Sequence, residues 1–256
     1  MQVTVITGAS AGIGAATARE LSSRGHRVVL AARSLDRLQE VAASLTTPSH
    51  TVVADVTQRA DVERLRDEAL QAFGQVDVWI NNAGRGITRP ILELTDADLD
   101  DMVTVNVRSV LYGVQTIIPY FQQRGSGHVI NVSSFLARVP LASVRSAYSA
   151  MKAAVNSLTA NLRMDLAATH PGIHVTTVMP GVVTTDFARN TRHFAGVLPT
   201  PPPGVTAFPP QTPEQVASVI ARVIEHPVAE AYTNPASPGI AKQYFDRIGA
   251  FSEVEP

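Results

Sequence analysis

The chain has 256 residues, of which 45% are hydrophobic and 17% charged, and its formal net charge is -1. This suits one large α/β domain with a substantial core, and gives no basic surface for nucleic acid. The chain has no cysteine, which excludes disulfides and thiolate metal sites.

No apolar run approaches the ~20 residues of a membrane helix. The run Val3 to Thr7 follows Met1 without a leader of signal-peptide form. We therefore expect a cytoplasmic protein with no membrane partner.

Short runs rich in valine and isoleucine alternate with longer segments of helical spacing. These runs are VTVIT, HRVVLA, HTVVA, VDVWI, GHVINVS and IHVTTVMP, with AEAYTNP near the end. Because they lack polar alternation, they are typical of strands in a parallel sheet covered by helices on both faces. We predict a Rossmann-type doubly wound fold of about seven strands, in a single domain over residues 1–256, with ligands beyond the carboxyl ends of the strands.

The first predicted strand ends in TGASAGIG, and a helix to about Arg24 follows. Glycines allow a tight turn and close approach of backbone N–H groups to phosphate, and the helix N-terminus adds partial positive charge. The spacing is GxxxGxG, one residue longer than the usual dinucleotide fingerprint. The strand, turn and helix together predict a nucleotide-binding site.

The second predicted strand ends in VVLAARS. An NAD-preferring site usually has an acidic residue about 20 residues after the glycines, which would repel a 2′-phosphate. Ala32 takes that place and Arg33 follows it, and a guanidinium can hold phosphate by paired hydrogen bonds. This predicts NADP rather than NAD, although Arg33 could also be a solvated surface residue.

The next two strands end in further polar residues. The Asp55 carboxylate could accept a hydrogen bond from the adenine amine, or Asp55 or Thr57 could cap the following helix. The fourth strand ends in NNAG, from Asn81 to Gly84, a turn that would lie beside the cofactor.

Asn106 lies inside LDDMVTVNVRSVLYGVQTIIPYF, a long amphipathic helix. Asparagine is a poor residue for a helix interior because its side chain competes for backbone hydrogen bonds. A local kink that holds a water and a satisfied buried amide are two explanations for its presence.

Ser134 ends the fifth predicted strand, and Tyr148 lies fourteen residues further along the chain. A serine hydroxyl there could donate to a substrate oxygen as negative charge develops. Tyr148 and Lys152 lie on a predicted helix at a spacing that puts them on one face. The ammonium would pull the phenol pKa from about 10 toward neutrality, so that it exchanges a proton at pH 7. Alone, the pair would be interpreted as a tyrosine packed on a lysine stem.

The sixth strand runs into MPGVVTT, whose hydroxyls could reach a nicotinamide amide. The proline-rich residues 187–213 are predicted to form a substrate lid, with Phe187 and Phe194 among the apolar residues that could cover a hydrophobic substrate. Helices are expected from about Pro213 to Glu225 and around Gly239 to Ile248. The histidines lack metal-ligand spacing, so no metal is expected.

TGASAGIG, NNAG, Asn106, Ser134, Tyr148-Ser-Ala-Met-Lys152 and PGVVTT, in this order, resemble the short-chain dehydrogenase/reductase family in its single-domain form. The resemblance covers roughly Val3 to Thr185. It implies that Tyr148 is the general acid/base, that Lys152 lowers its pKa and holds the nicotinamide ribose, that Ser134 polarises the carbonyl and that Asn106 positions a water.

The resemblance also implies a set of cofactor residues and leaves a smaller set for the substrate. The cofactor set is Gly8, Ser10, Gly12, Ile13, Gly14, Arg33, Asp55, Val56, Asn82, Ala83, Gly84, Tyr148, Lys152, Pro180, Gly181, Val183 and Thr185. The substrate candidates are Phe135, Leu136, Phe187 and Phe194.

Two features depart from the family pattern. The interval from Ser134 to Tyr148 is one residue longer than usual, which leaves Ser133 and Ser143 as alternatives to Ser134. Ala11 stands where many NADP-using relatives have a basic residue, which leaves Arg33 as the main phosphate ligand.

The resulting hypothesis is an NADPH-dependent carbonyl reductase or alcohol dehydrogenase acting on an apolar small-molecule carbonyl or alcohol, as a homodimer or homotetramer. The alternatives are a non-catalytic NADP-binding sensor or scaffold and an NAD-dependent alcohol dehydrogenase. Epimerisation or dehydration is disfavoured because the segment after Asp186 is short.

Overall fold

A computed structural model of the chain describes residues 1–185, 187, 191–193 and 209–246, without the side chain of Ser143. Within these residues, seven strands form one sheet in the order β3-β2-β1-β4-β5-β6-β7. Every neighbouring pair is parallel. The strands are β1 (Val3–Thr7), β2 (Arg27–Ala32), β3 (Ser49–Val53), β4 (Val78–Asn81), β5 (Gly127–Val132), β6 (Ile173–Met179) and β7 (Glu230–Tyr232). The predicted doubly wound α/β fold is confirmed.

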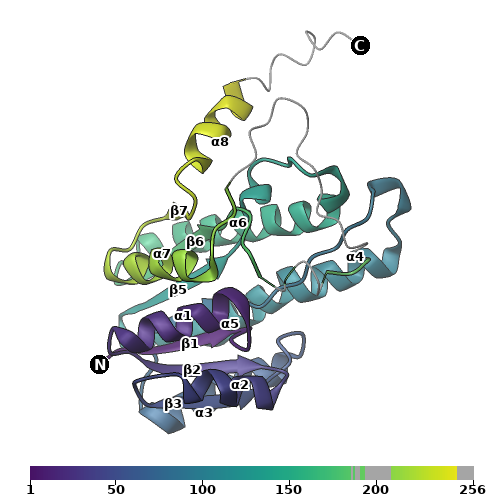
Figure 1. Cartoon of the computed structure of the whole chain (residues 1–256). Helices are drawn as coiled ribbons and strands as arrows, with labels where there is room; N and C mark the ends of the chain where they lie inside the picture. Colours follow the sequence, from purple (N-terminus) through teal and green to yellow (C-terminus); the bar gives the residue numbers. More distant parts are fainter. Residues whose placement is uncertain (186, 188–190, 194–208, 247–256) are drawn as a thin grey trace, which may run out of the picture.

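Helices connect the strands and cover both faces of the sheet (Figure 1). They are α1 (Gly12–Ser23), α2 (Leu35–Ala43), α3 (Arg59–Phe73), α4 (Asp96–Val103), α5 (Ser109–Arg124), α6 (Ser146–Ala167), α7 (Pro213–Glu225) and α8 (Ser237–Asp246). Short 3-10 turns lie at Ile91–Glu93, Phe135–Ala137 and Ser143–Arg145. The helix predicted from Pro213 to Glu225 has those bounds, and the last described helix begins slightly before the expected Gly239.

Two apolar clusters sandwich the sheet. One joins α1, α2 and α7 to strand side chains such as Ile6 and Leu30, and the other joins α3, α5 and α6 to side chains such as Val5 and Trp79. Neighbouring residues of one strand therefore point to opposite clusters, and both are buried. This double burial explains why the strands read as continuous apolar runs.

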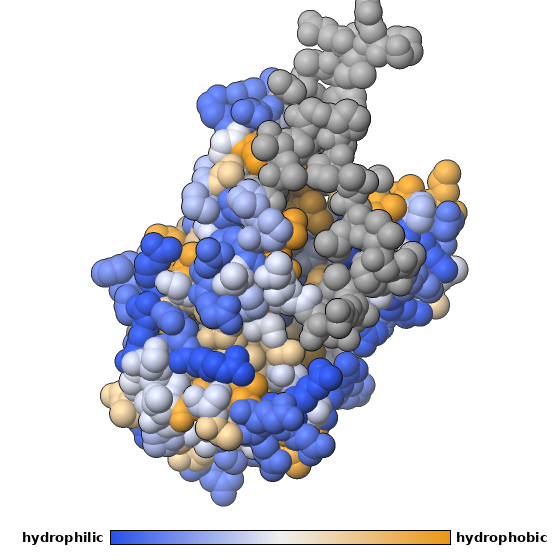
Figure 2. Space-filling model, in the orientation of Figure 1, coloured by the Kyte–Doolittle hydropathy of each residue, from blue (hydrophilic) through white to orange (hydrophobic). Residues whose placement is uncertain are grey.

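The surface visible in Figure 2 is mostly polar, with hydrophobic residues in separate patches. Among the described helices, none is long and apolar enough to cross a membrane.

Candidate active site

The glycine turn joins β1 to the N-terminus of α1. Gly8 and Gly12 have φ values of 66° and 53°, which glycine adopts without strain. A Cβ on Gly14 would lie 2.3 Å from the carbonyl oxygen of Gly8, so only glycine lets the helix begin this close to the strand. The N-cap residue Ala11 makes no side-chain hydrogen bond to α1, and no acidic residue lies in its first turn. The helix end therefore suits an anionic ligand.

The loop after β4 is fastened to this turn by Thr7 and Asn82. The backbone N–H groups of Asn82 and Ala83 donate to Thr7 Oγ1 over 3.0 and 3.1 Å. Asn82 Nδ2 donates to the carbonyl oxygens of Thr7 and Gly8 over 2.9 and 3.3 Å. The predicted NNAG motif therefore shapes the glycine turn.

At the end of β2, Ala32 is buried and Arg33 is exposed. The Arg33 guanidinium makes no hydrogen bond or ion pair within the described part of the chain, and no carboxylate occupies the position of Ala32. Arg33 is therefore free to meet an added phosphate.

Asp55 forms a local turn beyond β3. Its Oδ1 accepts from the N and Oγ1 atoms of Thr57 over 2.9 and 2.7 Å. The N-cap of α3 is Gln58, so neither Asp55 nor Thr57 caps that helix as one interpretation predicted. The other interpretation, adenine binding, stays a prediction.

Asn106 lies in a π-helical segment, Thr104–Arg108, between α4 and α5. This is the local irregularity expected from asparagine within a helix. Its amide is fully buried and satisfied: Nδ2 donates to the carbonyl oxygens of Arg85 and Met102 over 3.0 and 3.2 Å, and Oδ1 accepts from Arg85 N over 3.2 Å. Both sequence-based explanations thus apply in part, and the water stays a prediction. The side chain joins the helix to the loop after β4.

Tyr148, Lys152 and Ser134 come together beyond β5. Lys152 Nζ lies 5.9 Å from the centre of the Tyr148 ring and donates to the carbonyl oxygen of Val132 over 2.8 Å. The Ser134 hydroxyl lies close enough to the Tyr148 phenol to lower its pKa. Ser133 instead donates to the carbonyl oxygen of Lys152 over 3.1 Å. The geometry therefore favours Ser134 over Ser133, while the side chain of Ser143 lies outside the described part of the chain.

The extra residue between Ser134 and Tyr148 is accommodated in the loop. This loop contains the two 3-10 turns Phe135–Ala137 and Ser143–Arg145. Ser134 is the N-cap of the first turn, and its Oγ accepts from Leu136 N over 3.2 Å. The irregular loop thus keeps Ser134 beside Tyr148 despite the longer interval.

Burial shifts the pKa of both groups in the pair. Burial raises the pKa of Tyr148 to about 12, although the hydrogen bond with Ser134 and the charge of Arg145 oppose the rise. Burial lowers the pKa of Lys152 to about 8. The expected fall of the phenol pKa toward neutrality is therefore wrong for the chain's own groups, because desolvation dominates. The Lys152 ammonium donates its hydrogen bond to the carbonyl oxygen of Val132 rather than to the phenol.

The segment after β6 returns to the glycine turn. A Cβ on Gly12 would lie 3.2 Å from the methyl carbon of Thr185, and Thr185 Oγ1 accepts from Phe187 N over 3.2 Å. The rings of Phe187 and Tyr148 lie 5.7 Å apart between centres. Thr185 is thus beside the predicted phosphate turn, and Phe187 is beside the predicted catalytic tyrosine.

Other members of the implied sets have clear structural neighbours. Phe135 N donates to the carbonyl oxygen of Pro180, Gly181 lies near Asn234, and Val183 forms a bridge with Gln211. The first contact fixes the turn beyond β6 against the loop beyond β5, and the other two hold it to the segments after β7 and before α7. Ser10 lies in the glycine turn, Ile13 in the first turn of α1 and Val56 in the loop after β3, and all three are half-buried.

The substrate candidates differ in position. Phe135 is only 2% exposed and packs with Val139, Ala241 and Tyr232, which leaves little of its ring for a substrate. Leu136 packs in the apolar cluster that contains Tyr148. Phe194 and most of the predicted lid, residues 187–213, lie outside the described residues.

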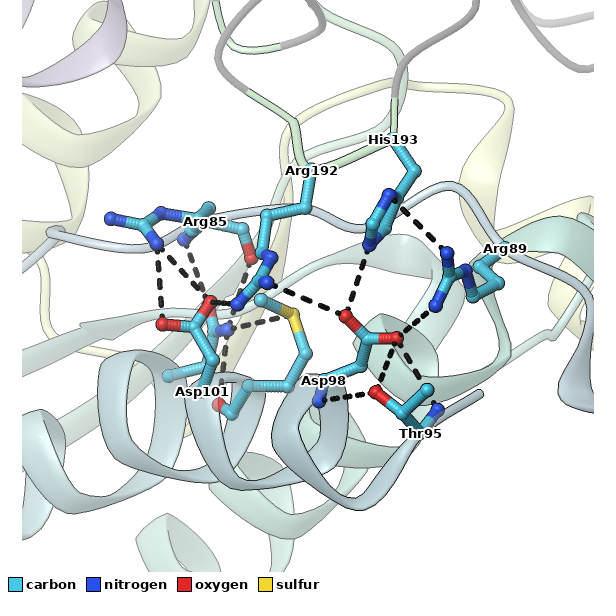
Figure 3. A network of polar contacts seen from close by, with 9 residues as sticks. Arg85, Arg89, Thr95, Asp98, Asp101, Arg192 and His193 are labelled. Atoms are coloured by element: carbon cyan, nitrogen blue, oxygen red, sulfur yellow. Dashed lines mark hydrogen bonds and ion pairs between the residues drawn. The ribbon is translucent and has the colours of Figure 1, made fainter. Parts of the chain in front are cut away.

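An ionic cluster holds residues 191–193 against α4 and the loop after β4 (Figure 3). Asp98, at the start of α4, accepts from Arg89 Nη1 over 2.6 Å and contacts His193 Nε2 at 3.0 Å. Asp101 pairs with both Arg85 and Arg192, at 3.1 and 3.3 Å. The interaction with His193, followed by hydrogen bonds from Thr95 and Arg89, holds the pKa of Asp98 well below its usual range.

Two residues near the site were missed by the sequence reasoning. Thr7 appeared there only as part of the glycine motif, although its hydroxyl fixes the loop after β4. Arg145, three residues before Tyr148, is 7% exposed and its charge acts on the Tyr148 phenol. The proximity of Arg145 to Tyr148 in the sequence was the available signal, but its burial could not be read from it.

Comparisons with known proteins agree with this architecture. Residues 2–196 match the family model described as short chain dehydrogenase. An uncharacterised oxidoreductase from Staphylococcus epidermidis is 36% identical over 190 residues, which cover 74% of this chain and 81% of that protein. The chain belongs to the short-chain dehydrogenase family and is an oxidoreductase of that family.

Two solved structures show the same fold with different cofactors. One, described as the closed form of serine dehydrogenase complexed with NADP+, has a TM-score of 0.82 at 27% identity, covering 92% of this chain and 96% of that one. The other is a short chain dehydrogenase/reductase from Burkholderia phymatum in complex with NAD, with a TM-score of 0.83 at 26% identity, covering 97% and 94%. Structural neighbours therefore bind either nucleotide.

Proposed function

We propose that the chain is an NADP(H)-dependent carbonyl reductase or alcohol dehydrogenase with Tyr148 as its general acid/base. The observation that carries this proposal is the meeting of Ser134, Tyr148 and Lys152 next to the glycine turn. A Cβ on Gly84 would lie 3.0 Å from Asn106 Oδ1 and 3.4 Å from Lys152 Nζ, so the loop after β4 joins the turn to the catalytic group. The residues proposed to bind the nucleotide and those proposed to transfer the proton thus lie together beyond the carboxyl ends of the strands.

The residues fit a dinucleotide. Gly8 and Gly14 stand where side chains would clash with the surrounding backbone, and the N–H groups at the start of α1 have no capping side chain. These groups would hold the pyrophosphate, Asn82 to Gly84 and Thr185 would line the nicotinamide half, and Lys152 would hold the ribose. When bound, the dinucleotide supplies or accepts the hydride.

In reduction, Tyr148 gives its phenol proton to the carbonyl oxygen while the carbonyl carbon gains a hydride, so that an alcohol forms. The Ser134 hydroxyl donates to the same oxygen and stabilises the charge that develops there. A phenol with a pKa of about 12 carries its proton at neutral pH, which is the state that proton donation requires. Asn106 would position the water through which the proton is replaced.

The proposed preference for NADP rests on Ala32 and Arg33. No carboxylate at the end of β2 opposes a 2′-phosphate, and the exposed Arg33 has no competing partner within the described residues. A phosphate can accept paired hydrogen bonds from such a guanidinium. An NAD-dependent alcohol dehydrogenase is the alternative, because a structural neighbour is described in complex with NAD.

The proposed substrate is a small carbonyl compound or alcohol with apolar parts. Phe187 is partly exposed beside Tyr148, and Leu136 and Met151 pack in the cluster around the phenol. Residues 187–213 are proposed as a lid within a single domain of 1–256. We further propose a cytoplasmic homodimer or homotetramer that associates through α5 and α6.

Consumption of NADPH over a panel of ketones, aldehydes and quinones tests the function. We expect turnover of at least one compound class, with NADPH preferred to NADH. Tight NADPH binding without turnover across the panel would instead favour a non-catalytic sensor or scaffold. Turnover with equal use of NADH would retain the reaction and overturn the cofactor preference.

A further inference from the structure

Arg145 is a buried cation at the entrance to helix α6. It is the N-cap residue of α6 and is 7% exposed. Its Nη1 donates to Thr191 Oγ1 over 3.2 Å and to the carbonyl oxygen of Ile87 over 3.4 Å. These two acceptors are neutral, and both contacts use the same nitrogen.

No carboxylate within the described residues pairs with Arg145, and its Nε and Nη2 make no hydrogen bond there. Neither nitrogen is among the fully enclosed polar atoms that lack a partner, so both keep some accessible surface. A buried charge without a counter-ion is costly, and charged groups inside proteins are normally paired. Burial accordingly lowers the pKa of Arg145.

The neighbouring arginines are paired, which makes Arg145 unusual in this region. Arg85 pairs with Asp101, and Arg89 pairs with Asp98. Arg192 contacts both aspartates. Asp98 and Asp101 of α4 are therefore already engaged, and Arg145 stays outside the ionic cluster of Figure 3.

Arg145 is also close to the proposed reaction centre. Its charge lowers the pKa of the Tyr148 phenol against the larger effect of burial. A Cβ on Gly86 would lie 2.7 Å from Arg145 Nη1 and 3.0 Å from the Phe187 ring. The guanidinium thus lies with Phe187 on the same side of the loop after β4, and Phe187 contacts the Tyr148 ring.

We propose that Arg145 binds a carboxylate of the substrate, so that the preferred substrates are oxo acids, or the matching hydroxy acids, with an apolar body. This inference rests on the proposed function, because it names the substrate class of the same site. The carboxylate takes paired hydrogen bonds from Nε and Nη2, which are arranged as a fork for such a group. Phe187 and Leu136 contact the apolar part while the carbonyl lies at Tyr148 and Ser134.

Matched acid and ester substrates test the proposal. The pairs are 4-acetylbenzoate with its methyl ester and 4-oxopentanoate with its methyl ester, each reduced with NADPH. The wild-type kcat/KM should favour the acid in at least one pair. Arg145→Gln should lower kcat/KM for that acid by about 10- to 100-fold, mostly through KM, since a hydrogen-bonded charge is lost. The ester should change by less than about threefold.

Two further variants separate binding from a general structural effect. Arg145→Lys keeps the charge without the fork and should retain part of the preference for the acid. Arg138→Gln removes an arginine from the same loop, where it pairs with Glu230, and should leave the preference unchanged. An absence of acid preference in the wild type, or an equal loss for acid and ester in Arg145→Gln, would overturn the proposal.

A binding experiment keeps this inference distinct from the proposed reaction. Calorimetry with NADPH-saturated Tyr148→Phe protein measures binding of 4-acetylbenzoate without turnover. Binding of the acid should exceed that of its ester, and the added substitution Arg145→Gln should abolish the difference. Should no compound be reduced by the wild type, this result still decides the role of Arg145, and equal binding of acid and ester would refute it.

Discussion

The side-chain nitrogen of Lys152 lies 2.8 Å from the backbone carbonyl oxygen of Val132, the last residue of β5. The ammonium is thereby fixed to the carboxyl end of β5, while Tyr148 lies one helical turn away on α6. Both side chains are buried, and burial moves their pKa values in opposite directions. Burying the Lys152 ammonium therefore lowers the stability of the folded protein at the site where the proposed chemistry needs a charge.

Lys152→Met should stabilise the protein at pH 7 in the absence of added cofactor. The folded-state pKa of about 8 lies below the usual 10.5, and each pKa unit corresponds to about 1.4 kcal/mol. Removing the ammonium should therefore gain on the order of 3 kcal/mol, less about 1 kcal/mol for the lost bond to Val132. Chemical denaturation measures the gain.

The pH dependence of this gain has a defined sign. The wild-type penalty is fully present below about pH 8 and disappears as pH rises to about 10.5, because the folded protein releases the Lys152 proton before the unfolded chain does. The advantage of Lys152→Met should shrink over that window. Lys242→Met, at an exposed ion pair with Asp246, is the control and should show no such trend. A variant less stable than wild type at pH 7 would contradict the prediction.

Tyr148→Phe should remove most turnover and leave NADPH binding nearly intact. The phenylalanine ring can keep the contact with Phe187, so the loss is confined to the hydroxyl that gives the proton. Steady-state kinetics and NADPH titration measure the two effects. Activity within about threefold of wild type would show that the proton comes from another group.

Arg33→Ala should raise the KM for NADPH far more than the KM for NADH. The guanidinium has no structural partner within the described residues, so its removal should not disturb the fold. Ala32→Asp should act in the same direction, because a carboxylate would repel the 2′-phosphate and hold the ribose hydroxyls of NADH. Equal changes for the two cofactors in both variants would rule out this basis for specificity.

Asp98→Asn should weaken the ionic cluster that holds residues 191–193. A carboxylate whose pKa is depressed in the folded state contributes stability above its unfolded pKa of about 4 and loses it as pH falls through the folded value. The variant should therefore melt below wild type at pH 7, and the difference should narrow in acid. Asp246→Asn, at an exposed pair, serves as the comparison. Similar melting of both variants at pH 7 would contradict the prediction.

Leu158→Glu should reduce association in solution. Leu158 on α6 is 43% exposed and Leu111 on α5 is 36% exposed, so both helices present apolar side chains outward. A charge within a buried interface is costly. Light scattering should give a smaller mass than for wild type. Leu92→Glu, at a side chain that is 96% exposed on the turn Ile91–Glu93, should leave the mass unchanged; an unchanged mass for Leu158→Glu would place the interface elsewhere.

The sequence by itself determined the fold and the placement of the motifs. Valine-rich runs buried on both faces of a sheet carry no polar alternation, so a parallel sheet with helices on both sides could be recognised from local pattern. The four-residue spacing of Tyr148 and Lys152 likewise fixed their shared helix face. The asparagine among valines at Asn106 also indicated a local kink as one explanation, and a π-helical segment lies there.

Only the tertiary structure decided the electrostatics of the site. The four-residue spacing puts Lys152 beside Tyr148. The direction of the phenol's pKa shift, however, depends on burial and on the hydrogen-bond acceptor of the ammonium, which is the carbonyl oxygen of Val132. The burial of Arg145 without a carboxylate partner among the described residues is similarly not readable from the sequence, because Asp98 and Asp101 of α4 pair with other arginines only once the loops are folded. Solvent exclusion and the choice of ion-pair partners arise from long-range packing, whereas helix faces and strand ends arise from neighbouring residues.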